Sequence, residues 1–388
     1  MQTGAHRGKT SRPWFHRPTI ALIIAAVRIV TGMALTQLIR HYVKPPTGVT
    51  PPQNWLASLT RWDANWYSNI ARHGYFSLPS HAFYPGFPLL VRLLAPLAGY
   101  SGATVVLSWA ATWIAIWGLL RVCDHYASAA SSDAATLLFA WGPLSLFLVA
   151  GYPESLLVAL TAWSLYFMTQ QKWAAAAILG GVASGILAQG LIIGPCLALT
   201  ILLSDPHARG WARALGWGLV SEAGFLGYCL YSQLRYANAF IMLRAERTVW
   251  RNQLSYPFHA FIRDAHYTFA PHVAASLRIY FAGDVLLGGI CVAVILGGAW
   301  VCRRQPSLIP PTVMLTLGLV LSSSTSNGAT TSLGRFVLFL APLYVVLATL
   351  LDTIPVRVRM IASSQLITLA TILGIIYGIM FAVGYRIV

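Results

Sequence analysis

Long apolar runs are the feature that most constrains the fold of this chain. Eleven stretches are close to the length of about 20 residues that an α-helix needs to cross a bilayer. They lie at about 20–39, 103–120, 134–150, 155–169, 173–189, 191–203, 212–233, 284–302, 307–322, 333–351 and 361–383. Charged residues make up only 9% of the chain, whereas soluble domains carry roughly 25%. We therefore predict an all-α polytopic membrane protein, which excludes the soluble globular folds.

The first apolar run follows a basic segment, residues 1–18, and in that respect resembles a signal sequence. Its length of about 20 residues is enough to span the bilayer, and many further runs follow. We therefore predict an uncleaved first helix with a cytoplasmic basic tail before it.

The positions of basic residues predict how the chain is oriented. With the N-terminus inside, the short loops that carry Lys and Arg all become cytoplasmic, as the positive-inside bias requires. These loops contain Arg121, Lys172, Arg209, Arg213, Arg303, Arg304, Arg357 and Arg359. Two long segments, 40–102 and 234–283, then lie outside. The net charge of +16 is thus explained by membrane orientation and does not require nucleic acid as a partner. We expect one multi-pass domain, residues 1–388, in the plasma membrane, or in the endoplasmic reticulum membrane if the source is eukaryotic.

Cysteine and acidic residues give no sign of a metal site. The five cysteines are scattered, mostly inside apolar runs, which is typical of buried apolar side chains. No two of the ten acidic residues lie closer than nine positions, so the paired carboxylates of many metal-dependent transferases are absent. We predict no metal and no cofactor. The alternative is a cluster assembled by folding, for which Asp264, His266 and His272 are the candidates.

The segment 61–76 of the first outer region combines an apolar stripe with a carboxylate. Leu59, Trp62, Trp66 and Ile70 recur at spacings of three and four, which predicts an amphipathic helix at the membrane interface. Asp63 stands beside this stripe. A carboxylate at the border of water and lipid can accept a proton from a sugar hydroxyl. The alternative is a helix-start residue or an ion-pair partner of Arg61.

Several blocks of the sequence resemble one family. The arrangement Trp62-Asp63, Trp66-Tyr67, Ile70-Ala71 and His73-Gly74-Tyr75, followed by AFYPGFPLLVRLLAP (82–96), resembles the PIG-V-like mannosyltransferases, integral-membrane glycosyltransferases of the GT-C class. Arg28 in the first run and the stretches 151–160, 239–258 and 334–348 fall in the family's order. Gln189 stands where the resemblance leads us to expect an arginine.

The resemblance implies a donor, an acceptor and a base. The donor would be a polyprenyl-phosphate mannose, the acceptor a glycan or glycolipid, and transfer would invert the anomeric carbon. An acidic residue of the first outer loop would be the base, and Asp63 matches that position. A lipid monophosphate leaving group needs less help from a metal than a nucleoside diphosphate does.

Four further charged residues are candidates for substrate binding. Glu154 begins the fourth run, where a carboxylate either stabilises the helix N-terminus by about 0.3–1 kcal/mol or binds the acceptor. Arg335, Arg247 and Arg251 are candidates for the donor phosphate. For the outer arginines the alternative is a solvated face beside anionic lipid headgroups.

Arg28 is harder to explain without function, because a charge at mid-bilayer costs roughly 2.5–3.5 kcal/mol. We expect it to pair with a buried acidic or phosphate group. His73 could bind phosphate or serve as a turn residue before Gly74. Arg61 and Tyr84, which lie in the resembling blocks, complete the set of substrate-binding candidates.

Two other classes of protein remain compatible with these features. A secondary transporter or lipid flippase would also be polytopic with buried charges, and a non-catalytic subunit of a mannosyltransferase complex would share the resemblance. Transporters place polar residues at the midplane of broken helices, often in two matching halves. Here the polar residues concentrate in two outer segments and no half-repeat is visible, which favours the enzyme.

Overall fold

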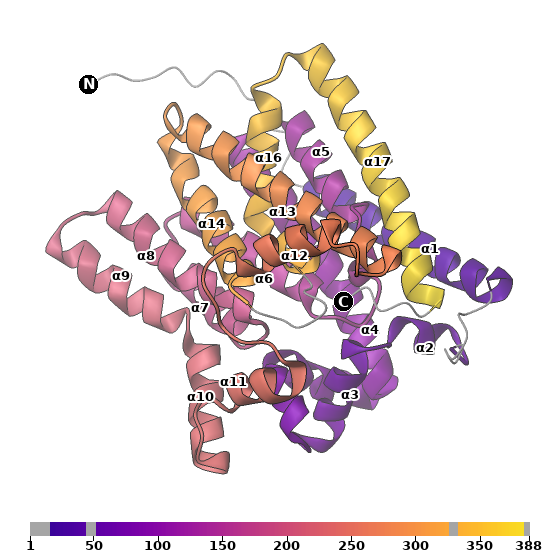
Figure 1. Ribbon diagram of the computed structural model, residues 1–388. Helices are drawn as coiled ribbons and strands as arrows, with labels where there is room; N and C mark the ends of the chain where they lie inside the picture. Colours follow the sequence, from indigo (N-terminus) through magenta and orange to yellow (C-terminus); the bar gives the residue numbers. More distant parts are fainter. Residues whose placement is uncertain (1–15, 44–51, 326–332, 384–388) are drawn as a thin grey trace, which may run out of the picture.

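The computed structural model of this protein describes residues 16–43, 52–325 and 333–383 (Figure 1). Within these ranges the chain is helical, and its only strand-like pairing is an isolated bridge between Leu254 and Thr325. The prediction of an all-α polytopic fold is confirmed.

The helices follow one another with short connections. The α-helices are α1 (His16–Tyr42), α2 (Trp55–Leu59), α3 (Asp63–His73), α4 (Gly86–Tyr126), α5 (Ala129–Ala140), α6 (Glu154–Thr169), α7 (Trp173–Ser184), α8 (Ile193–Ser204), α9 (Ala208–Val220), α10 (Ala223–Tyr236), α11 (Ile241–Ala245), α12 (His259–Phe269), α13 (Ala275–Cys302), α14 (Ile309–Ser323), α15 (Leu333–Leu338), α16 (Ala341–Asp352) and α17 (Val356–Val383). The described residues also form four 3₁₀ turns and one π-turn: η1 (Leu78–Ala82), η2 (Ser145–Leu148), η3 (Ala188–Ile192), η5 (Pro306–Leu308) and the π-helical η4 (Glu246–Trp250).

In the part of the chain that the structure describes, five helices are long and apolar enough to cross a membrane. They lie at Arg17–Tyr42, Gly86–Tyr126, Leu277–Cys302, Pro306–Ser323 and Val356–Val383. Every predicted apolar run contains a helix, but α7, α8 and α16 have 12 residues each, about 18 Å against a hydrocarbon core of about 30 Å. The count of eleven spans therefore stays a prediction.

Helix α4 is longer than the apolar run that predicted it. It extends over 41 residues and bends at Gly99, which follows Pro96 and has a positive φ of 67°. The outer arm before the bend belongs to the segment that the sequence placed in the first outer loop. This arm packs on α3, where Arg92 Nε donates to the Ala71 carbonyl at 2.6 Å.

The predicted amphipathic helix is present as α3, but the apolar stripe does not run through it from Leu59. Helix α2 ends at Leu59, and Leu59 packs in a different apolar cluster from Ile70. Trp62, at φ 55° and ψ −118°, separates the two helices, because these angles cannot continue a helix. The expectation of one continuous stripe was wrong at this turn.

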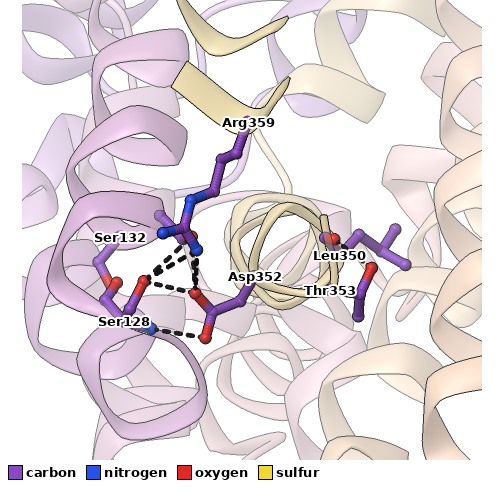
Figure 2. Close-up of polar contacts among 7 residues, drawn as sticks. Ser128, Ser132, Leu350, Asp352, Thr353 and Arg359 are labelled. Carbon is purple, nitrogen blue, oxygen red and sulfur yellow. Dashed lines mark hydrogen bonds and ion pairs between the residues drawn. The ribbon is translucent and has the colours of Figure 1, made fainter. Parts of the chain in front are cut away.

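Polar clusters tie the helices together at the end of the bundle far from α3. Arg17 pairs with Asp124 and Asp133, which joins the start of α1 to the end of α4 and the start of α5. Figure 2 shows a second cluster, in which Arg359 and Ser128 converge on the carboxylate of Asp352. This cluster fixes the turn between α16 and α17 against α5.

The Arg17 cluster generates the first prediction. Arg17 is 2% exposed, and removing one partner of a buried ion pair leaves the others uncompensated, at a cost of about 3–5 kcal/mol. We expect Arg17→Gln to lower the melting temperature of the purified protein in detergent. Arg40→Gln is the matched control, because Arg40 is exposed near the other end of the same helix. Equal melting temperatures for the two variants would contradict the structural role of the cluster.

Candidate active site

Three charged residues from distant parts of the chain meet at the α3 end of the bundle. The guanidinium of Arg335, on α15, donates from Nη1 to Asp63 Oδ2 at 2.9 Å and from Nε to Glu154 Oε1. Asp63 and Glu154 are the first residues of α3 and α6. The sequence singled out all three as candidates, and the structure brings them into direct contact.

Burial distinguishes the three members of this charged cluster. The side chain of Arg335 is 3% exposed and that of Glu154 is 1% exposed, whereas Asp63 is 19% exposed. The guanidinium carbon of Arg335 lies 5.0 Å from the ring centre of Phe147 and 5.2 Å from that of Tyr152. Arg335 and Glu154 thus form the buried floor of the site. Asp63 is the member of the cluster that an incoming molecule can reach.

Local backbone geometry fixes Asp63 at the mouth of the site. Trp62 holds a left-handed φ of 55°, which is rare for a bulky residue and costs of order 1–3 kcal/mol. The hydroxyl of Tyr152 donates to the Arg61 carbonyl at 2.9 Å and so holds the turn from the side of α6. Asp63 then opens α3, where its charge is favourable at the helix N-terminus.

The connection before α6 lies very close to α4 and to the first outer region. The Gly151 amide donates to the Leu59 carbonyl at 2.9 Å. A Cβ at Gly151 would lie 2.2 Å from Thr104 Oγ1, so only glycine fits there. Glu154 Oε2 is buried and finds no hydrogen-bond partner among the described residues. The tight turn therefore places the carboxylate of Glu154 in a buried position beside Arg335.

The second outer segment contributes Glu246, an acidic residue that the sequence analysis missed. Trp250, four residues later, contacts Trp66 and Phe83 edge-on, with ring centres 6.0 Å apart in both pairs. Burial raises the pKa of Glu246 to about 7, a hydrogen bond from Asn252 opposes the rise, and the charge of Asp63 adds to it. Glu246 is the only acidic residue in the block 239–258, among several arginines. That single carboxylate is the sequence feature that could have identified it.

The remaining candidates lie elsewhere. His73 is exposed at the far end of α3, and Arg247 and Arg251 are exposed on the second outer segment. Tyr84 packs against Phe225 and Tyr228. None of these four candidates forms a hydrogen bond or ion pair with the charged cluster in the described part of the chain.

Three other residues that the sequence singled out have defined positions. Arg61 is half-buried and reaches the Ala382 carbonyl at 3.4 Å. Gln189 is buried in η3. Arg28 lines a separate cavity, where the described residues offer its guanidinium no carboxylate. The predicted roles of Arg28 and Arg61 in substrate binding stay predictions, as does that of Arg335 in binding phosphate.

No group of three or more His, Cys, Asp or Glu side chains is placed to hold a metal ion in the ranges that the structure describes. Asp264 pairs with the neighbouring Arg263, and its side chain is buried. The prediction that activity needs no metal remains to be tested by experiment.

Comparison with known proteins bears on what this site does. Residues 50–198, which include Asp63 and Glu154, match the sequence profile of the family described as Mannosyltransferase (PIG-V). The resemblance to PIG-V-like mannosyltransferases is confirmed.

The "GPI alpha-1,6-mannosyltransferase 2" of Mus musculus is 32% identical over 172 residues, covering 41% of this chain and 34% of that protein. The proteins of the same name from Rattus norvegicus and Homo sapiens are 32% identical over 149 residues, covering 35% of this chain and 30% of each of them. The aligned part thus spans about a third of the length of these relatives.

Among solved structures, the chain is similar to an Archaeoglobus fulgidus oligosaccharyltransferase, with a TM-score of 0.46 and 13% sequence identity. The match covers 92% of this chain and 53% of that one.

Glu246 generates a prediction about pH. Between pH of about 4.5 and about 7 the folded protein keeps a proton on Glu246 that the unfolded chain releases. The free energy of unfolding therefore falls as the pH rises through this window, and Glu246→Gln removes that contribution. We therefore expect the difference in melting temperature, variant minus wild type, to increase as the pH rises from about 5 to about 8. If the melting temperatures of wild type and variant changed in parallel with pH over this range, the raised pKa of Glu246 would be contradicted.

Proposed function

We propose that this protein is a membrane mannosyltransferase that takes mannose from a polyprenyl-phosphate sugar and transfers it, with inversion, to a glycolipid or glycan acceptor. The proposal places the reaction on the extracytoplasmic side and makes Asp63 the general base. The observation that carries it is the geometry of Asp63, the one reachable carboxylate of the charged cluster.

The chemistry requires a base in this position. An acceptor hydroxyl is a weak nucleophile at neutral pH, and a carboxylate that takes its proton during attack assists the reaction. Asp63 Oδ2 is bonded to Arg335, and Oδ1 accepts no hydrogen bond from the described residues, so it is available for the acceptor. Inversion places the acceptor opposite the leaving phosphate, which is too distant to collect this proton.

The bond changes balance without a further reactant. The acceptor oxygen forms a bond to the anomeric carbon, and its proton passes to Asp63. The bond from the anomeric carbon to the phosphate oxygen breaks, and its electron pair leaves with the lipid phosphate. Arg247 and Arg251, exposed on the second outer segment, are proposed contacts for that phosphate.

Glu154 and Arg335 act as positioning residues in this proposal. Both are almost fully buried, so neither side chain meets the acceptor directly. Arg335 holds Asp63 by one nitrogen and is itself held by Glu154 through another. This arrangement fixes the direction of the carboxylate before the acceptor arrives.

The central test is Asp63→Asn, which keeps size and polarity but removes the proton acceptor. We expect turnover to fall by about 10²–10⁴. The melting temperature should fall as well, because Arg335 keeps Glu154 but loses the charge of Asp63, so turnover is compared at a temperature where both proteins are folded. Mannosyl transfer by the purified protein in lipid is the measurement. Asp205→Asn is the matched control, because Asp205 lies in the α8–α9 connection and pairs there with Arg213. Wild-type turnover in Asp63→Asn would refute the assignment of the base.

Glu154→Gln separates positioning from acceptor binding within the same assay. If Glu154 acts through Arg335, the variant lowers kcat and leaves the Michaelis constant of the acceptor nearly unchanged. A raised Michaelis constant with unchanged kcat would instead place Glu154 in contact with the acceptor. An inactive, well-folded Glu154→Gln beside an active Asp63→Asn would make Glu154 the base.

The donor class leads to a separate prediction. A lipid monophosphate needs little help from a metal as it leaves, so transfer from a polyprenyl-phosphate mannose should continue in excess chelator. Activity that requires GDP-mannose and disappears with chelator would refute the donor class. Loss of activity in chelator with the polyprenyl donor would refute only the metal-free chemistry.

Orientation can be tested with single cysteines in a background without the native ones. His73 and Ser307 are both exposed, on α3 and in the α13–α14 connection respectively. We expect an impermeant maleimide to label His73→Cys from outside intact cells and Ser307→Cys only after the membrane is opened. The reverse pattern would place Asp63 on the cytoplasmic side and contradict the proposal.

A further inference from the structure

The second outer segment places a carboxyl group and an amide side by side near Asp63. The Asn252 side chain donates from Nδ2 to Glu246 Oε2 at 3.2 Å, and its backbone amide donates to the Glu246 carbonyl at 2.9 Å. Both bonds form because Arg251, at a left-handed φ of 55°, turns the chain back after η4. The two side chains are thus joined into one unit, which we call the Glu246–Asn252 pair.

Aromatic contacts hold this pair against α3. Trp250, which precedes Asn252 by two residues, contacts Trp66 of α3, and its Nε1 donates to the Pro79 carbonyl at 3.4 Å. Trp66 follows Asp63 by three residues and therefore lies on the same face of the helix. The pair thus borders the mouth of the site, where Asp63 lies.

Each member of the pair has one oxygen without a hydrogen bond. Asn252 Oδ1 is buried and finds no partner among the described residues, and no hydrogen bond to Glu246 Oε1 occurs there either. A buried acceptor without a donor is costly, and native proteins leave few of them. The two free oxygens therefore indicate a ligand that brings hydrogen-bond donors.

Glu246 has no cationic partner, although arginines surround it in the sequence. Arg244, Arg247 and Arg251 are all exposed, and none forms an ion pair with Glu246 in the part of the chain that the structure describes. Burial raises the pKa of Glu246 to about 7, so much of the population carries a neutral carboxyl at neutral pH. Such a site suits an uncharged ligand better than an ammonium group, which favours the ionised carboxylate.

A sugar ring matches these features. Its hydroxyl groups can donate hydrogen bonds to the free oxygens, and its carbon-bound hydrogens can pack on the rings of Trp66 and Trp250. Both rings are half-buried, so each keeps part of its surface open. A lipid tail would leave the two free oxygens unpaired.

We propose that the Glu246–Asn252 pair selects the hexose held beside Asp63, with Glu246 Oε1 and Asn252 Oδ1 each accepting a hydrogen bond from a ring hydroxyl. The transferred hexose and the acceptor sugar present the same chemistry to the pair, and the experiment below distinguishes them. A ring without the recognised hydroxyl leaves one of the oxygens unpaired, which is the basis of selection. That the hexose is a substrate rests on the proposed function.

Deoxy sugars test the pair, because each analogue lacks one hydroxyl. Monodeoxy analogues of the donor hexose and of the acceptor sugar are compared with their parent compounds by kcat/KM, with the full-length protein in nanodiscs. In wild type, at least one analogue should lose about tenfold or more, as an unpaired buried acceptor predicts. In Glu246→Ala or Asn252→Ala the loss for that analogue should shrink to about threefold or less, because the oxygen that accepts its hydroxyl is gone.

Thr248→Ala is the matched control. Thr248 is exposed on the same π-turn, its hydroxyl donates to the Arg244 carbonyl, and the variant should keep the wild-type loss. Each ratio is measured within one preparation, so partial unfolding of a variant does not change it. A reduced loss in the donor series identifies the transferred hexose as the ligand, and one in the acceptor series identifies the acceptor. Wild-type losses in both alanine variants across both series, or a wild type that uses every analogue equally well, would overturn the proposal.

A binding measurement without turnover separates this proposal from the proposed function. Saturation-transfer NMR with methyl α-D-mannopyranoside should give a signal with wild type and Thr248→Ala that weakens in Asn252→Ala. Equal results for wild type and Asn252→Ala would overturn the pair. A signal of the expected kind in a protein that transfers no mannose would leave the pair standing and refute the function. Mannosyl transfer with unchanged losses for the deoxy sugars would refute the pair alone.

Discussion

The ion pairs of Arg335 with Asp63 and Glu154 hold the functional end of this protein together. They join α15 to the first residues of α3 and α6, across 272 and 181 positions of sequence. In a chain with only ten acidic residues, two of them converge on one arginine. The aromatic rings of Phe147 and Tyr152 cover Arg335, and its ion pair with the buried Glu154 is strengthened, because a low local dielectric raises the energy of charge pairs.

Much of this arrangement could be anticipated, for a physical reason. In an apolar chain every charge that is not in a cytoplasmic loop requires an explanation, so Asp63, Glu154, Arg335 and Arg28 each stood out individually. Their contacts could not be anticipated, because three-dimensional packing and not sequence spacing brings Arg335 to the carboxylates. The same limit hid Glu246, whose proximity to Asp63 depends on how the second outer segment folds back.

The helical fold followed from apolar periodicity, but backbone exceptions did not. The break between α2 and α3 depends on the left-handed φ of Trp62, a residue type for which that conformation is unexpected. One apolar run, 173–189, covers both α7 and part of η3, and another, 333–351, covers both α15 and α16, because hydropathy does not show where a helix ends and the next begins.

The bend of α4 at Gly99 has a mechanical consequence. The inner arm is fixed in the core and, through Asp124, to Arg17, while the outer arm is fastened to α3 by Arg92. A single residue without a side chain joins these two arms, so the direction of the outer arm relative to the inner arm is set by the backbone conformation of Gly99. The placement of the helix that carries Asp63 thus depends on a backbone conformation that glycine adopts readily and other residues rarely do.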